Sequence, residues 1–184
     1  MKQVTFITGN QSKADYLQRL LGVVVEHRKI DLDEIQSLNL KEIVERKVKQ
    51  AYEVTQSPVI VEDVSLEFNA LNSLPGPFIK YYVEYAGLEK TCRMLDSFSD
   101  KSAIAKCVFG YYDGNKIELF EGMLEGQISK EPVGNNGYGW DQIFIPDGYG
   151  GRTRAELSQE ENDVIYQIIK PFDLLREFIY EIKM

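Results

Sequence analysis

A short polar run near the start of the chain, Thr8–Lys13, has residue types suited to holding a phosphate, and it directly follows the apolar stretch Val4–Ile7. Gly9 can adopt backbone angles that are closed to other residues, and the side chain of Asn10 can accept hydrogen bonds from free amides. Lys13 lies where the exposed N–H groups and the positive dipole end of a following helix favour an anion. The pattern predicts a phosphate-binding turn, although the same residues also suit a purely structural turn between a strand and a helix.

Two places in the sequence supply candidate metal ligands: Glu62 and Asp63 directly after the apolar run Val59–Val61, and Glu34 within the acidic segment Asp31–Gln36. In an open α/β sheet, residues at the end of a strand border the crevice where ligands bind. Magnesium usually takes one or two protein carboxylates together with substrate phosphates, which makes Asp63 and Glu34 candidates. Taken alone, Glu34 is better explained as a solvated turn residue, and Asp63 is equally well explained as a helix or turn cap.

A loop rich in glycine and aromatic residues, Gly137–Asp141, offers a second kind of binding site. Its two glycines flank Tyr138, and Asp141 follows Trp140, so one ring can be exposed for stacking while a carboxylate faces the same cavity. Stacking on a base contributes roughly 1 to 3 kcal/mol in nucleic-acid complexes. The alternative is that the rings only anchor the loop in the core. On a predicted amphipathic helix, Lys47 is either a solvated charge or a group that reaches a polyphosphate.

The elements that must position these residues alternate along the first third of the chain. Apolar residues recur in the pattern strand, helix, strand, helix, strand, which favours an α/β fold with a sheet flanked by helices. The predicted elements are a strand at Val4–Ile7, a helix at Ala14–Leu21, a strand at Val23–Ile30, an amphipathic helix from Leu40 to Val54, and a strand at Val59–Val61 with Glu62 and Asp63 at its end.

The second half of the chain carries longer loops and antiparallel strands. Asp113–Asn115 predicts a tight hairpin, and Ser158 with Glu161 has the spacing of a capping box that begins a helix. Pro171 predicts either a kink near Lys170 or a new helix that takes the proline as its first residue. The other predicted elements are a helical stretch at Phe78–Phe98 with a break at Gly87, strands at Ala103–Tyr112 and Lys116–Glu121, a further strand that begins at Gln127, and a short strand at Gln142–Ile145.

Length and composition bound the class of protein. The chain has 184 residues, of which 43% are hydrophobic, so a single domain spanning residues 1–184 is expected. Its net charge of -8 argues against long-range attraction to a nucleic acid polymer or an anionic membrane. The sequence has neither a charged leader followed by an apolar core nor an apolar run of membrane-spanning length, so a cytoplasmic location is expected. Cys92 and Cys107 are expected to be buried free thiols.

Together these motifs resemble the inosine triphosphate pyrophosphatase family, whose members hydrolyse non-standard purine nucleoside triphosphates to the monophosphate and pyrophosphate. The resemblance runs nearly end to end. The segments that carry it are Thr8–Asn10 with Lys13, Ile30–Gln36, Lys47, Val61–Asp63, Phe68–Leu71, Leu74–Pro77, Gly139–Asp141 with Phe144, Pro146–Gly148, and Ala155–Leu157.

The resemblance implies an elongated mixed sheet with helices, arranged as two lobes with the active site in the cleft between them, and usually a homodimer. Magnesium is the implied cofactor, with manganese as the alternative, and a nucleoside triphosphate is the implied ligand. Glu34 and Asp63 would hold the metal, and the implied catalytic residues are Asp63, which would help to activate water, and Lys13. The implied substrate contacts are Thr8, Asn10, Lys13 and Lys47 on the triphosphate, and Tyr138, Trp140 and Asp141 on the nucleoside.

The chain departs from that family in the residues that read the base. The family's C-terminal helix carries a lysine followed shortly by Ser-His-Arg, and an ungapped alignment through Ala155–Leu157 places Asn162 at the lysine and Tyr166–Ile168 at the triplet. The family's histidine and arginine read the oxygen of a hypoxanthine or xanthine base, so the usual discrimination does not carry over. Tyr16 also stands where the family usually has a glutamate.

Two functions from different classes follow from these observations. The first is a nucleoside triphosphate pyrophosphohydrolase with altered or relaxed base preference, because the lysines and carboxylates of the phosphate site are retained. The second is a relative that binds a nucleotide or a protein partner without turnover, because the base-reading residues are lost. A third hypothesis, related to the first, is that Gln167 or Lys170 lies on a shifted helix and replaces the lost base contacts.

Overall fold

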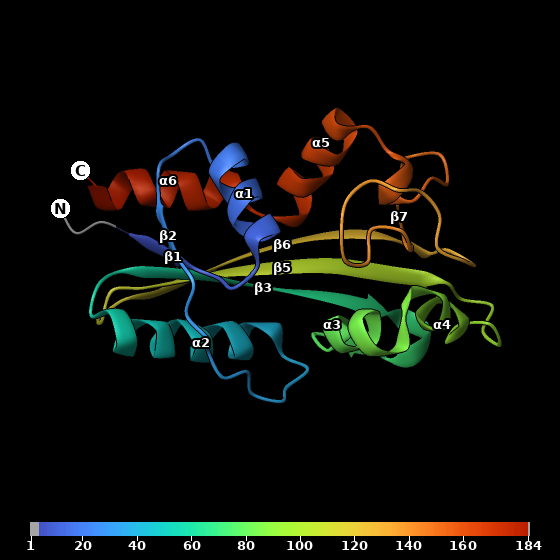
Figure 1. Ribbon diagram of the computed structural model, residues 1–184, viewed down its shortest axis with the longest axis horizontal. Coiled ribbons are helices and arrows are strands. Elements are labelled where there is room, and N and C mark those ends of the chain that lie inside the picture. The colour runs from blue at the N-terminus through green and yellow to red at the C-terminus, as the bar shows by residue number, and fades with distance from the viewer. Residues whose placement is uncertain (1–3, 184) are drawn as a thin grey trace. The chain divides into compact units, whose positions relative to one another are not determined.

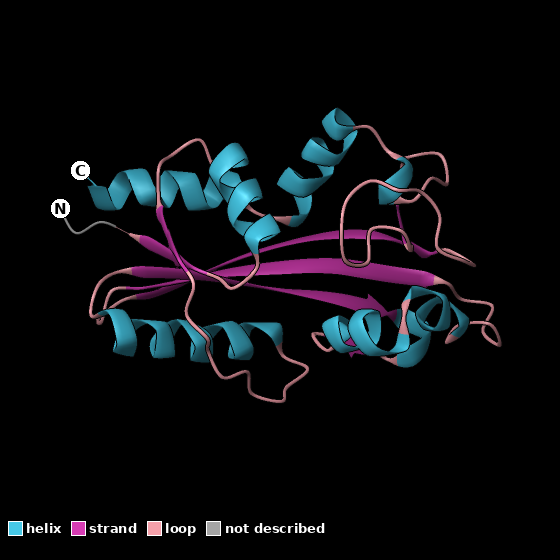
Figure 2. Cartoon of the chain, viewed as in Figure 1, coloured by secondary structure: helices cyan, strands magenta, loops and turns pink. Residues whose placement is uncertain are grey.

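The computed structural model describes residues 4–183 and has a mixed α/β fold. Seven strands form one open sheet in the order β2-β1-β3-β5-β6-β7, with β4 paired to β3, and helices flank it (Figure 1, Figure 2). The strands are β1 (Thr5–Ile7), β2 (Glu26–Arg28), β3 (Val59–Phe68), β4 (Pro75–Gly76), β5 (Ser102–Tyr112), β6 (Ile117–Ile128) and β7 (Phe144–Pro146). The helices are α1 (Gln11–Leu20), α2 (Leu40–Thr55), α3 (Ile79–Tyr81), α4 (Leu88–Arg93), α5 (Gln159–Ile169) and α6 (Phe172–Lys183), with short helical turns η1 (Asn69–Leu71), η2 (Tyr82–Ala86) and η3 (Arg154–Glu156). The predicted fold class is confirmed.

Two compact units share the chain. Unit 1 comprises Met1–Asp63, Cys107–Gly122 and Lys170–Met184, and unit 2 comprises Val64–Lys106 and Met123–Ile169. The chain therefore passes from one unit to the other at four points, within β3, within β5, within β6 and between α5 and α6. Each unit is assembled from segments that are far apart in the sequence. The predicted cleft between two lobes stays a prediction.

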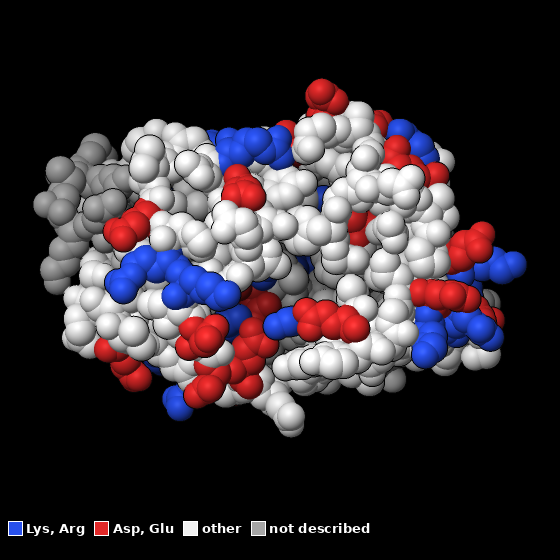
Figure 3. Space-filling view, in the orientation of Figure 1, with Lys and Arg blue, Asp and Glu red and all other residues white. Residues whose placement is uncertain are grey.

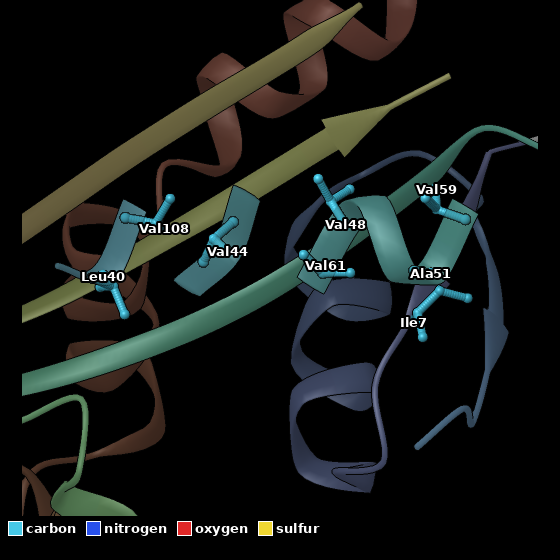
Figure 4. Packing of buried hydrophobic residues seen from close by; sticks show 8 residues of the cluster. All are labelled: Ile7, Leu40, Val44, Val48, Ala51, Val59, Val61 and Val108. Carbon is cyan, nitrogen blue, oxygen red and sulfur yellow. The ribbon is translucent and has the colours of Figure 1, made fainter. Parts of the chain in front are cut away.

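Helix α2 packs its apolar stripe on the strands of unit 1. Four apolar residues of α2 recur every three or four positions, which brings them to one face of the helix. The side-chain oxygen of Asn39 begins the helix by accepting hydrogen bonds from the amides of Lys41 and Glu42. The buried cluster drawn in Figure 4 combines Leu40, Val44, Val48 and Ala51 of α2 with Ile7, Val59, Val61 and Val108 of the strands.

Helices α1 and α6 lie on the side of these strands opposite to α2 (Figure 1). Side chains alternate along a strand, so Val108 joins the cluster of α2 while its neighbour Phe109 meets Phe172 of α6, with ring centroids 5.7 Å apart. Arg176 of α6 also donates a hydrogen bond to the carbonyl oxygen of Leu20 at the end of α1, at 3.0 Å. Unit 1 is thus a sheet segment covered on both faces, as expected for an α/β fold.

Unit 2 joins a sheet segment to short helices and to α5. Strand β7 pairs antiparallel with β6, with Phe144 beside Ile128. Helix α5 begins with the predicted capping box: the Glu161 amide donates to Ser158 Oγ at 3.2 Å, and the Ser158 amide donates to a carboxylate oxygen of Glu161 at 2.9 Å. Large buried side chains of this unit include Leu66, Phe68, Ile79, Leu95 and Ile143.

The predicted end of the third strand is wrong. Strand β3 continues without a break to Phe68, so Glu62 and Asp63 lie within a strand and not at its end. The strand continues because Val64, Leu66 and Phe68 resume an apolar pattern with a period of two after the carboxylates. The two acidic residues therefore lie inside a continuous strand, with strand residues before and after them.

Other predicted elements differ in extent. The second strand is limited to Glu26–Arg28, whose three residues are all exposed, so little burial favours a longer strand. Strand β6 runs unbroken to Ile128, so no separate strand begins at Gln127. Gly87, at φ 87°, separates the helical turns before it from α4, as predicted. After Pro171 a new helix begins, as one of the two alternatives predicted, although its first residue is the one that follows the proline.

Candidate active site

The turn between β1 and α1 is held by its own side chains. Asn10 is the N-cap of α1, because its Oδ1 accepts a hydrogen bond from the amide of Lys13 at 3.2 Å. The amide of Asn10 donates to Thr8 Oγ1 at 3.1 Å, and the Thr8 carbonyl oxygen lies 2.9 Å from His27 Nε2. The turn thus has the structural role that the sequence allowed, and it also fixes the start of a helix whose N-terminus favours an anion.

Strand register brings this turn to the carboxylates of β3. Strands β1 and β3 pair in parallel, with Ile7 beside Val61. The next residue along β1 is Thr8, and the next along β3 is Glu62. The polar turn therefore leaves β1 at the level where β3 carries its two acidic residues.

Glu62 binds two lysines from distant parts of the sequence. Its Oε1 lies 2.7 Å from Lys170 Nζ and 3.3 Å from Lys13 Nζ. The Glu62 side chain is 1% exposed, and its other oxygen, Oε2, is buried without a hydrogen-bond partner among the described residues. Burial raises the pKa of Glu62, but the charges of Lys170 and Lys13 outweigh burial, and the pKa lies below its ordinary value. Glu62 is therefore an ionised carboxylate shared by two ammonium groups.

Lys47 lies between the two carboxylates that the resemblance assigned to a metal. Its Nζ is 2.9 Å from Glu34 Oε1 and 3.1 Å from Asp63 Oδ2. Burial lowers the pKa of Lys47, but the charges of Asp63 and Glu34 outweigh it and leave the pKa above its ordinary value. The residues expected for the triphosphate and the metal all belong to unit 1; they are Thr8, Asn10, Lys13, Glu34, Lys47 and Asp63.

Glu34 and Asp63 have the chemistry that suits a divalent cation. Both carboxylates are within hydrogen-bond reach of the same nitrogen atom. Within residues 4–183, no group of three or more His, Cys, Asp or Glu side chains is arranged to hold a metal ion. Magnesium commonly combines one or two protein carboxylates with phosphate oxygens and water. The donor set therefore fits a cation that is shared with a phosphate ligand.

In unit 2, Asp141 forms a buried ion pair with Arg154. Arg154 Nη1 lies 2.8 Å from Asp141 Oδ1, and the two side chains are 3% and 4% exposed. Asn162 of α5 accepts a hydrogen bond from Arg154 Nε at 3.3 Å. The second oxygen of Asp141 accepts a hydrogen bond from the amide of Tyr138 at 3.0 Å. Asp141 therefore holds its own loop and pairs with a cation that the sequence analysis did not single out.

Aromatic rings surround the same guanidinium group. Arg154 Cζ lies 4.4 Å from the ring centroid of Tyr166 and 5.9 Å from that of Trp140. The hydroxyl groups of Tyr166 and Tyr138 form a hydrogen bond of 2.7 Å. Trp140 also meets the buried ring of Phe144 edge-on at 5.6 Å, so it anchors its loop as the structural alternative required.

Helix α5 carries the residues that depart from the family pattern, and these residues differ in burial. Asn162 and Tyr166 are buried against Arg154, whereas Gln167 and Ile168 are exposed. Lys170 follows the helix and binds Glu62 of unit 1. The hypothesis that Gln167 or Lys170 replaces the lost base contacts gains no support from these positions.

Sequence reasoning missed the partners of two cations. Arg154 pairs with a carboxylate 13 residues away, and Lys170 pairs with one 108 residues away. The available signal for Lys170 was its place directly before Pro171, where a helix must end. A lysine at such a break is ordinarily exposed, so its burial could be recognised only from the folded chain.

Comparison with known proteins decides the family. Residues 4–178 match the model of the Ham1 family. The chain belongs to the Ham1 family. One relative of this Ham1 protein, the inosine triphosphate pyrophosphatase of Scheffersomyces stipitis, is 39% identical over 194 aligned residues, which cover 97% of this chain and 98% of that protein. The inosine triphosphate pyrophosphatase of Pyricularia oryzae is 44% identical over 168 aligned residues, which cover 89% and 86%. The family predicted from the motifs is confirmed.

Solved structures of Ham1 proteins share the fold. The Ham1 protein of Staphylococcus aureus has a TM-score of 0.82 at 26% sequence identity, covering 97% of this chain and 99% of that chain. The Ham1 protein of Coxiella burnetii has a TM-score of 0.83 at 26% identity, covering 98% and 100%. The agreement extends over nearly the whole Ham1-family chain.

The charged surface is mixed in sign on the face drawn in Figure 3, where acidic and basic side chains lie next to one another. Among the helices of residues 4–183, none combines the length and the apolar character needed to cross a membrane.

Proposed function

We propose that this protein hydrolyses nucleoside triphosphates to the nucleoside monophosphate and pyrophosphate, with a divalent cation and an altered base preference. The observation that carries the proposal is a pair of lysines in unit 1 that are held by carboxylates: Lys13, at the capped start of α1, pairs with Glu62, and Lys47 of α2 pairs with Glu34 and Asp63. Relatives similar over nearly their whole length are named inosine triphosphate pyrophosphatases, which supports the same reaction class.

The two lysines supply the positive charge for the triphosphate. Hydrolysis forms a bond between the water oxygen and the α-phosphorus and breaks the bond from that phosphorus to the bridging oxygen of pyrophosphate. Negative charge grows on the leaving group as this bond breaks, and Lys13 and Lys47 lower the energy of that charge. Their carboxylate partners keep them in one place before the substrate arrives, so less side-chain entropy is lost on binding.

Asp63 is the proposed base, and with Glu34 it is the proposed ligand of a magnesium or manganese ion. Such an ion, when bound, supplies Lewis-acid stabilisation of the phosphate oxygens. Asp63 accepts or orients the proton of the attacking water, because its carboxylate is only partly buried and lies beside Lys47. Asp63 lies inside strand β3, with strand residues before and after it, which favours a fixed backbone position for this carboxylate.

The residues proposed to contact the nucleoside are Tyr138, Trp140 and Asp141, which belong to a cluster of unit 2 that also includes Arg154 and Tyr166. A tyrosine hydroxyl group can both donate and accept a hydrogen bond. The pair formed by Tyr138 and Tyr166 can therefore adapt to a carbonyl or an amino group on a base, whereas a site of fixed donors rejects one of them. This chemistry supports a relaxed preference.

A panel of nucleotides tests the proposal. The purified protein is incubated with the four common nucleoside triphosphates and with inosine and xanthosine triphosphates, in magnesium or in manganese. We expect monophosphate and pyrophosphate in equal amounts from at least one of them. Diphosphate and phosphate as products would contradict the reaction class, and tight binding without any product would indicate a relative that has lost turnover.

Two expectations about the protein as a whole stay predictions. The homodimer is tested by measuring the mass of the full chain in solution at several concentrations. The cytoplasmic location is tested by fractionating cells that produce the protein.

A further inference from the structure

The two lysines on Glu62 are not equivalent. Both approach the same oxygen, Oε1, but Lys170 does so at 2.7 Å and Lys13 at 3.3 Å. The Lys170 side chain is 5% exposed and the Lys13 side chain is 14% exposed. Lys170 is thus the closer and more deeply buried partner of the carboxylate, and Lys13 is the more distant and more accessible partner.

Charge balance gives the two contacts different roles. A buried carboxylate without a partner is strongly unfavourable, so Glu62 needs at least one cation at all times. Lys170 meets that need at the shorter distance, and the cluster of Glu62, Lys13 and Lys170 then carries one excess positive charge. The excess charge is placed on Lys13, which belongs to the first turn of α1.

We propose that Lys170 is a positioning residue of the phosphate site: it neutralises Glu62 and thereby releases Lys13 to bind a polyphosphate. The inference rests on the proposed function for the identity of the ligand, a chain of phosphate groups. Before the ligand binds, Lys13 shares Glu62 with Lys170. When the ligand binds, Lys13 moves its hydrogen bonds to phosphate oxygens, and Lys170 alone keeps the buried carboxylate neutralised.

Removal of Lys170 has a definite consequence under this proposal. Glu62 would have Lys13 as its remaining cation within the cluster. The attraction between two opposite charges is much stronger in a buried site than in water, so Lys13 would be drawn to Glu62 and lost to the ligand. Removal of the Glu62 charge in the same chain would set Lys13 free again.

A double-mutant cycle tests this proposal without turnover. Inorganic tripolyphosphate is titrated into the full chain by calorimetry, in a buffer with a chelator, so that a metal role of nearby carboxylates cannot contribute. We expect Lys170→Met to bind at least about tenfold more weakly than the wild type, and Lys170→Arg, which keeps the charge, to bind within about threefold of it. The double variant Glu62→Gln, Lys170→Met is expected to regain most of the affinity.

The single variant Glu62→Gln is a second measurement, which does not depend on the folding of Lys170→Met. It removes the carboxylate charge that holds Lys13, so we expect binding of tripolyphosphate at least as tight as in the wild type. Lys49→Met is the matched control, because Lys49 is a lysine of unit 1 whose partner, Glu45, is half-exposed on the same helix. Circular dichroism of each variant confirms the fold.

Three results would overturn the proposal: unchanged affinity in Lys170→Met, no recovery in the double variant, or weaker binding in Glu62→Gln. A lack of recovery would mean that Lys170 contacts the ligand itself. Failure of the wild type to bind tripolyphosphate would also overturn it. Absence of nucleotide hydrolysis, by contrast, would refute the proposed function. The tripolyphosphate affinities of the wild type and the variants would still decide whether Lys170 positions Lys13.

Discussion

Arg154 and Asp141 form an ion pair in which both side chains are almost completely buried, with 2.8 Å between Nη1 and Oδ1. Asn162 completes the arrangement, since its Nδ2 donates to the Arg154 carbonyl oxygen at 2.9 Å and its Oδ1 accepts from Arg154 Nε. An ion pair removed from water contributes to stability only where its other polar groups are also bonded. The pair therefore ties three segments of unit 2 together: the aromatic loop, η3 and α5.

Loss of one member of this pair is expected to destabilise the protein. Arg154→Met leaves Asp141 buried without its cation, so the free energy of unfolding in urea should fall by about 3 kcal/mol. Arg152→Met is the matched control, because Arg152 pairs with Glu161 at the surface, and its effect on the free energy of unfolding should be much smaller. Equal losses in the two variants would contradict the assignment.

The neighbouring lysines of α2 separate a role in the site from a role on the surface. Lys47→Met removes the ammonium group that Glu34 and Asp63 share and that is proposed to bind the triphosphate, so kcat/KM for the best nucleotide should fall by at least about tenfold. Lys49→Met breaks only a half-exposed pair with Glu45 and should leave kcat/KM within about twofold. Similar losses in both would show that the effect of Lys47 is not specific to the site.

Asp63→Asn tests the proposed base and metal ligand. The amide keeps the shape of the side chain but loses the negative charge, so kcat should fall by at least about a hundredfold while circular dichroism stays unchanged. Asp96→Asn, at an exposed pair with Arg93, is the matched control and should keep the wild-type kcat. Full activity of Asp63→Asn would refute the assignment.

Local patterns predicted the helices well because their signals lie within a few residues of one another. The apolar stripe of α2 and the capping box of Ser158 and Glu161 depend on spacings of three and four, which the sequence displays directly. The continuation of β3 was missed because Glu62 and Asp63 interrupt its apolar run. Their partners, Lys170 and Lys47, lie 108 and 16 residues away, so the compensation was invisible to a local pattern.

The candidate site was likewise predicted only in part. The resemblance to a known family predicted the convergence of Glu34, Lys47 and Asp63, which the structure shows as two ion pairs on one lysine. Arg154 could not be predicted in the same way, because the resemblance placed the expected cation on the helix after it. Asn162 stands at that position and binds Arg154, which is the cation that pairs with Asp141.

The two cysteines offer separate probes of the two units, because Cys107 belongs to unit 1 and Cys92 to unit 2, and both thiols are free and buried. Burial raises the pKa of Cys107 well above its ordinary value, with the negative charge of Glu62 acting in the same direction, and burial also raises the pKa of Cys92. A thiol reagent that attacks the thiolate should therefore label neither residue in the native protein at pH 8 within minutes, and labelling should speed up as the pH rises. Both should react at once in denaturant. The single variants Cys92→Ala and Cys107→Ala assign each rate, and fast labelling of native Cys107 would contradict its enclosure beside Glu62.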